Sequence, residues 1–118
     1  MANAYRDFID FMADLARGSV TAKRIRAQGH AERANERDLA LTEPEARRRA
    51  ALLAMSDEQR AVVAELLEQE RIGSVHDVIA NLDAFDIRLD GRTLPEQAEE
   101  EPKFDLLDRL EGRPWRNY

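Results

Sequence analysis

Apolar residues recur at helical spacing along most of the chain, and this pattern predicts a mainly helical protein. Between Tyr5 and Ala16 they fall on one face of a helix that ends at Gly18. A second helix is predicted from Ser19 to Leu41, but it holds few large apolar residues, so we expect it to be partly exposed or broken near Gly29. The apolar face of the first helix comprises Tyr5, Phe8, Ile9, Met12, Leu15 and Ala16.

Two capping boxes predict where the central helices begin. Thr42 stands three residues before Glu45, and Ser56 stands three residues before Gln59. Within each pair, each side chain can accept a hydrogen bond from the backbone amide of the other residue. Gly73 follows a run of helical turns, and we expect it to end one helix at a corner from which the next runs to Phe85. The predicted buried residues of this helix pair are Val62, Val63, Leu66, Leu67, Val75, Val78, Ile79 and Leu82.

The apolar period changes after Phe85. Residues 87–94 alternate around Asp90-Gly91, a dipeptide that favours the type I′ turn of a β-hairpin. Residues 95–102 predict a solvated acidic linker, which leads to a short helix ended by Gly112. Phe104, Leu107 and Leu110 are the apolar residues of that helix, and we expect Trp115 to fold back onto the body.

These elements predict a mainly α fold. We expect a small bundle of four to five helices with a short β-hairpin near the C-terminus, in a single helical domain over residues 1–118. The length is enough for one modest hydrophobic core.

Composition narrows the function classes. The chain has no cysteine, which excludes a disulfide framework and a thiolate metal site. No apolar run approaches the roughly 20 residues that span a bilayer, and the acidic N-terminal stretch lacks a signal peptide's apolar core, so we expect a cytoplasmic protein. No catalytic or cofactor motif stands out, and no cofactor is predicted.

Charge is unevenly distributed. Residues 1–55 carry ten Lys or Arg against eight Asp or Glu, whereas residues 56–118 carry eight against sixteen. A basic cluster in the first half is a candidate for weak nucleic-acid binding, because phosphate contacts need only a local patch. Ordinary solvated arginines paired with nearby glutamates are the preferred interpretation, since no aromatic residues are interleaved with them. The cluster comprises Lys23, Arg24, Arg26, Arg47, Arg48 and Arg49.

His76 beside Asp77, with Glu70 one turn away through the predicted corner at Gly73, is the candidate for a metal-assisted or acid–base site. A metal site usually needs three or four convergent ligands, and no pattern supplies the others. A histidine that packs and hydrogen-bonds is the preferred interpretation.

The acidic residues Glu99, Glu100 and Glu101 are the candidate partner-binding residues. The weak helix from Ser19 to Leu41 gains little from packing within its own domain and is a candidate for ordering by a partner. We therefore predict a non-enzymatic protein-interaction or regulatory module that binds another protein or a second copy of itself as a homodimer.

Several segments resemble a family of small uncharacterised bacterial proteins. The similar segments are residues 56–67, 73–77 and 105–115; Tyr5, Phe8 and Ile9 match an N-terminal Tyr-x-x-Phe-Ile pattern, and residues 110–115 match a Leu-x-Gly-x-x-Trp ending. Residues 21–49 fit less well. The resemblance implies an α-helical fold with a small hairpin and no assigned activity, and it makes the corner at Gly73, His76 and Asp77 the first place to look.

Overall fold

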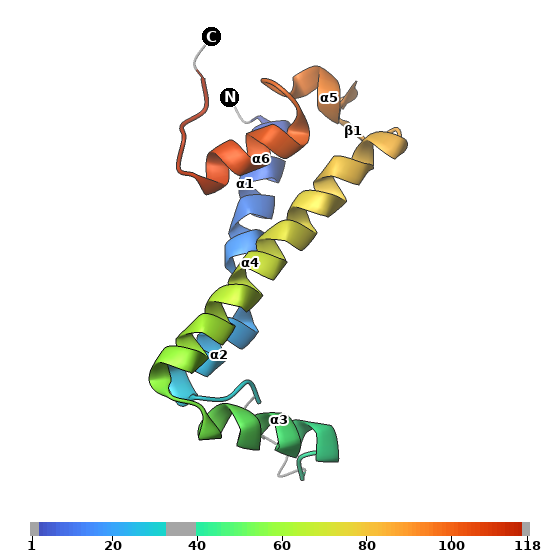
Figure 1. The fold of residues 1–118 in the computed structure, drawn as a ribbon. Helices are drawn as coiled ribbons and strands as arrows, with labels where there is room; N and C mark the ends of the chain where they lie inside the picture. The colour runs from blue at the N-terminus through green and yellow to red at the C-terminus, as the bar shows by residue number, and fades with distance from the viewer. Residues whose placement is uncertain (1–2, 33–39, 117–118) are drawn as a thin grey trace. The chain divides into compact units, whose positions relative to one another are not determined.

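The computed structural model describes residues 3–32 and 40–116, which are mainly helical with a short antiparallel hairpin near the C-terminus (Figure 1). This confirms the predicted fold class. The sequence predicted one domain over residues 1–118, and the structure divides the chain into two compact units. The terminal unit combines Met1–Gly18 with Arg71–Tyr118, and the middle unit is Ser19–Glu70.

Helix α1 (Ala4–Arg17) is the first element of the terminal unit. The Asn3 side chain accepts a hydrogen bond from the Arg6 amide at 3.1 Å, and the Gly18 amide donates to the Leu15 carbonyl at 3.1 Å, so both ends of the helix are capped. The residues that α1 buries recur every three or four positions: Tyr5, Ile9, Ala13 and Ala16. Ala13 is not part of the predicted apolar face, whereas Leu15 of that face is 38% exposed.

The remainder of the terminal unit closes on α1. Helix α4 (Asp57–Asn81) contributes its last turns, and the 3-10 helix η1 (Leu82–Ala84) follows. Strands β1 (Arg88–Leu89) and β2 (Arg92–Thr93) pair antiparallel around Asp90 and Gly91, whose φ angles of 57° and 78° fit the predicted type I′ turn. Helices α5 (Leu94–Gln97) and α6 (Pro102–Leu110) complete the unit, and α6 packs against α1.

One hydrophobic core holds the terminal unit together. Its buried members come from α1, α4, α5 and α6, and Trp115 packs against them as predicted. The core residues are Tyr5, Ile9, Ala13, Ile79, Leu94 and Leu106.

The middle unit has a second, smaller core. Helix α2 (Val20–Gln28) ends where Gly29 adopts the left-handed conformation at φ 79°, which confirms the predicted break near Gly29. Helix α3 (Glu43–Ala54) begins at the predicted Thr42 capping box, and the hydrogen bond from the Thr42 hydroxyl holds the pKa of Glu45 below its usual value. The buried core residues are Ala22, Ile25, Leu52 and Ala64. Residues 33–39 of the predicted second helix lie outside the described part.

The predicted corner at Gly73 is wrong. The Ser56 capping box is present, with the Gln59 amide donating to Ser56 Oγ at 3.1 Å, but α4 then continues through Gly73 to Asn81. Gly73 does not have the positive φ that a helix-ending glycine adopts at Gly29. It lies inside the helix, where a glycine is tolerated at a cost of about 1 kcal/mol.

Two further predictions differ from the structure. Val62, Leu66 and Val78 of the predicted buried face are 51%, 64% and 53% exposed, and Ala64 is fully buried instead. The stretch predicted as a solvated linker is partly folded, because Thr93 caps α5 and the Ala98 amide donates back to Leu94.

Candidate functional site

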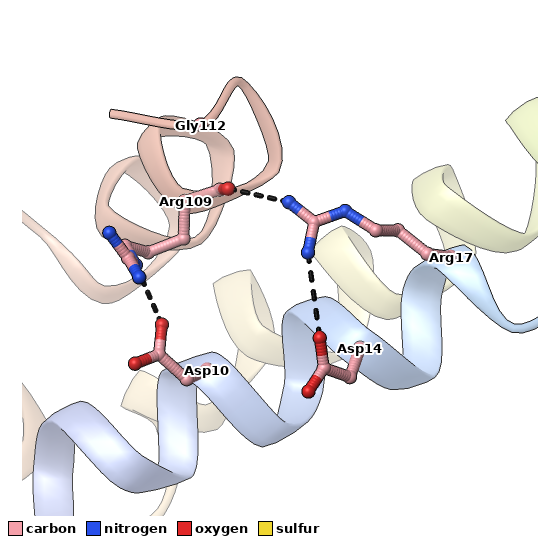
Figure 2. A pocket seen from close by; sticks show the side chains of 5 residues that line it. All are labelled: Asp10, Asp14, Arg17, Arg109 and Gly112. Atoms are coloured by element: carbon pink, nitrogen blue, oxygen red, sulfur yellow. Dashed lines mark hydrogen bonds and ion pairs between the residues drawn. The ribbon is translucent and has the colours of Figure 1, made fainter. Parts of the chain in front are cut away.

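Helices α1 and α6 border an open cleft in the terminal unit (Figure 2). Its volume is about 390 Å³. We call it the α1–α6 cleft; its lining residues are Asp10, Asp14, Arg17, Arg109 and Gly112. Successive turns of α1 supply the two carboxylates, and α6 supplies Arg109.

One side of the cleft is a closed set of polar contacts. Arg109 Nε donates to Asp10 Oδ1 at 2.6 Å, and the Trp115 indole N–H donates to Asp10 Oδ2 at 3.2 Å. The guanidinium groups of Arg6 and Arg109 lie 5.1 and 5.4 Å from the Trp115 ring centroid, within the range of cation–π attraction. Both oxygens of Asp10 are therefore occupied, and this side of the cleft is structural.

The other side is more open. Arg17 donates to the Arg109 carbonyl at 2.6 Å, but its contact with Asp14 is long at 3.5 Å, and the Asp14 side chain is 81% exposed (Figure 2). An exposed ion pair at this distance contributes about 0–1 kcal/mol. Asp14 is therefore held only weakly by Arg17.

Asp105 of α6 forms a buried polar centre in the same unit. Its carboxylate accepts the Tyr5 hydroxyl at 2.5 Å and the backbone amides of Glu99 and Glu100 at 3.0 and 3.4 Å. Burial, the hydrogen bond to Asp105 and nearby negative charge together raise the pKa of Tyr5 well above its usual value. The phenol stays protonated as a donor, so this pair joins α1 to α6.

An apolar stripe at the helical spacing i, i+3, i+4 and i+7 runs along the edge of the buried face of α1. Its inner residues, Phe8 and Met12, pack partly against the core, whereas Phe11 and Leu15 are 61% and 38% exposed. We call these four residues the apolar stripe. The sequence placed Phe8, Met12 and Leu15 on the apolar face of the first helix but did not include Phe11.

His76 and Asp77 lie next to each other on α4. His76 Nδ1 is 3.4 Å from Asp77 Oδ1, and the Asp77 side chain is largely exposed. Glu70 stands six residues earlier on the same helix, about 120° away around its axis. Within residues 3–32 and 40–116, no three His, Asp or Glu side chains come together to hold a metal ion.

The predicted partner-binding glutamates differ in environment. The Glu99 side chain is only 12% exposed and faces Arg6 at 3.4 Å and the Arg116 amide at 2.7 Å. Glu100 lies 3.4 Å from Arg116, and Glu101 lies 3.6 Å from Lys103. Glu99 is thus held inside the terminal unit, while Glu100 and Glu101 remain on its surface.

The predicted basic cluster is divided between α2 and α3 of the middle unit. Arg26 forms an ion pair with Glu68, and Arg48 lies 3.7 Å from Glu32. Lys23, Arg47 and Arg49 are exposed. Part of the cluster is therefore paired with glutamates, as in the preferred interpretation.

The profile of a family described as "Family of unknown function (DUF6547)" matches residues 1–117. This confirms the resemblance to a family without an assigned function. Neither the comparison with curated proteins nor that with solved structures gave a match. In the described part of the chain, no helix is both long and apolar enough to cross a membrane.

Proposed function

We propose that this chain, which belongs to the family of unknown function DUF6547, is a non-enzymatic protein-interaction module that binds its partner through the apolar stripe of α1. The observation that carries the proposal is the exposure of Phe11, at 61%, beside Leu15 on a rigid helix. Contiguous apolar side chains on a surface favour contact with another protein.

The support for α1 is its fixed position. The helix is capped at both ends, and the face next to the stripe lies in the core, with Tyr5 and Ile9 fully buried. Phe8 and Met12 pack on that core as well. A preorganised surface of this kind loses little conformational entropy when a partner binds.

Charge supports a protein partner rather than nucleic acid. The terminal unit carries nine Lys or Arg against fourteen Asp or Glu, a net of −5. A phosphate backbone would be repelled by such a surface. The same charge disfavours pairing of two terminal units, so we propose a different protein as the partner; a homodimer is the alternative. Cytoplasmic location stays a prediction.

The proposal is tested by affinity capture from the native host's lysate with matched variants. Phe11→Ser removes the most exposed apolar residue of the stripe, and Phe85→Ser removes a 69% exposed phenylalanine elsewhere in the same unit. Capture of the partner should fall at least about tenfold with Phe11→Ser and stay unchanged with Phe85→Ser.

Two further arms separate the alternatives. Chelator treatment should leave capture unchanged, whereas loss of the partner would favour a metal site near His76 and Asp77. Nuclease treatment should likewise have no effect, and loss there would favour the basic cluster. Equal capture by Phe11→Ser and wild type would contradict the proposal.

A further inference from the structure

We infer that the partner presents a basic amphipathic helix, whose apolar side chains pack on the apolar stripe while its Lys or Arg residues meet Asp7 and Asp14. This inference rests on the proposed function and adds the chemistry of the partner. It combines two independent features of α1, the geometry of the stripe and the charge along its edge.

The geometry favours a helix as the occupant. Phe8 and Met12 form one row with spacing i, i+4, and Phe11 and Leu15 form the next, so the stripe consists of two parallel rows of side chains. The stripe extends about 10 Å along the axis, or two helical turns. An amphipathic helix with apolar residues at i, i+3, i+4 and i+7 fits such a surface. Backbone pairing by an added strand is excluded here, because the backbone groups of α1 are already hydrogen-bonded within the helix.

The charge along the edge favours a basic partner. Asp7 and Asp14 stand four positions before and three positions after Phe11, so both lie on the turns that border the stripe, and both are exposed. In the part of the chain that the structure describes, Asp14 pairs only with Arg17, at 3.5 Å, and no Lys, Arg or His lies within ion-pair distance of Asp7. The net charge of −5 on the terminal unit would attract a cationic helix from a distance as well.

Two designed peptides test the inference directly. Both are amphipathic helices with the same leucine face; one carries lysines on its polar face and the other carries glutamates. Binding is measured by fluorescence anisotropy of the labelled peptide against the full chain at about 50 and 200 mM salt.

We expect the lysine peptide to bind at least about tenfold more tightly than the glutamate peptide. The double variant Asp7→Asn/Asp14→Asn should weaken the lysine peptide about three- to tenfold at low salt and flatten its salt dependence. The matched control Glu58→Gln/Glu65→Gln removes two exposed charges from α4 in the middle unit and should have no effect on binding. Circular dichroism checks that each variant is folded.

The outcomes separate this inference from the proposed function. If both peptides bind equally and both are weakened by Phe11→Ser, the stripe is a binding surface and the basic partner is wrong. If the lysine peptide binds but tolerates Phe11→Ser, its binding is non-specific and the inference falls. If neither peptide binds, the helical partner is wrong, while the proposed function is still judged by capture. Concentration-dependent dimerisation that Phe11→Ser abolishes would replace the basic helix with a second copy of the chain.

Discussion

Replacing Gly73 with alanine distinguishes the continuous helix from the helix-ending corner that the sequence suggested. At a corner, glycine would adopt a positive φ, and alanine there would cost roughly 1–2 kcal/mol. In the structure Gly73 lies within α4 without a positive φ, and no atom lies within 4 Å of the position that a Cβ would take. The added methyl group therefore meets no neighbour.

The structure predicts that Gly73→Ala stabilises the protein. Alanine is favoured over glycine inside a helix by about 0.5–1 kcal/mol, because the unfolded chain loses conformational freedom. With a urea dependence of about 1 kcal/mol per molar for a unit of this size, the unfolding midpoint should rise by about 0.5–1 M. Fluorescence of Trp115, the one tryptophan of the chain, reports this transition because the ring packs on the core of the same unit.

Gly112→Ala is the matched control. Gly112 belongs to the same unit and also has no atom within 4 Å of a Cβ, but its φ is +80°. Alanine should destabilise this position by about 1 kcal/mol. The two glycines thus differ in backbone conformation, whereas both have room for a Cβ. A lower midpoint for Gly73→Ala would contradict the continuous helix.

Two further predictions concern the buried polar centre. Asp105→Ala leaves the Tyr5 hydroxyl and two backbone amides without their acceptor, and it should lower the free energy of unfolding by about 3 kcal/mol in urea titrations. The control Asp108→Ala removes a surface ion pair with Arg113 and should lower it by less than about 1 kcal/mol. Equal losses for the two variants would refute the role of Asp105. Because folding raises the pKa of Tyr5, only the unfolded chain releases this proton above pH 10. Between pH 9 and pH 11 the free energy of unfolding of wild type should therefore fall by about 1.4 kcal/mol relative to that of Tyr5→Phe. Parallel pH profiles of the two proteins would contradict this.

Local signals in the sequence predicted the ends of several elements. The capping residues Thr42 and Ser56 act within three residues of themselves, and the Asp90-Gly91 turn depends on the φ angles of two neighbours. The break at Gly29 was predictable for the same reason. These features need no knowledge of distant residues.

Gly73 shows where local signals fail. A glycine followed by Ser74 and Asp77 has the residues of a helix end and a new cap, but the apolar period continues across it, since Leu67 and Val75 are eight positions apart. The continuing period was the better guide. A glycine within a helix costs about 1 kcal/mol, and packing on both sides of it can exceed that cost.

The candidate site depends on contacts that a single sequence does not reveal. Tyr5 meets Asp105 across a separation of one hundred residues, and Asp10 meets both Arg109 and Trp115. The sequence predicted that Trp115 folds back, but it did not predict its carboxylate partner. Likewise, Glu99 lies in an acidic run of the kind that is usually exposed, and only its contacts with Arg6 and Arg116 show that it is largely enclosed.

Hydroxyl-radical footprinting of the captured complex is the most direct test of the proposed binding surface. The method compares the labelling of phenylalanine side chains in the free and the bound protein. The account predicts strong protection of Phe11 in the complex and unchanged labelling of Phe85, which is exposed in the same unit. Unchanged labelling of Phe11 in a complex that remains intact would contradict binding through the apolar stripe.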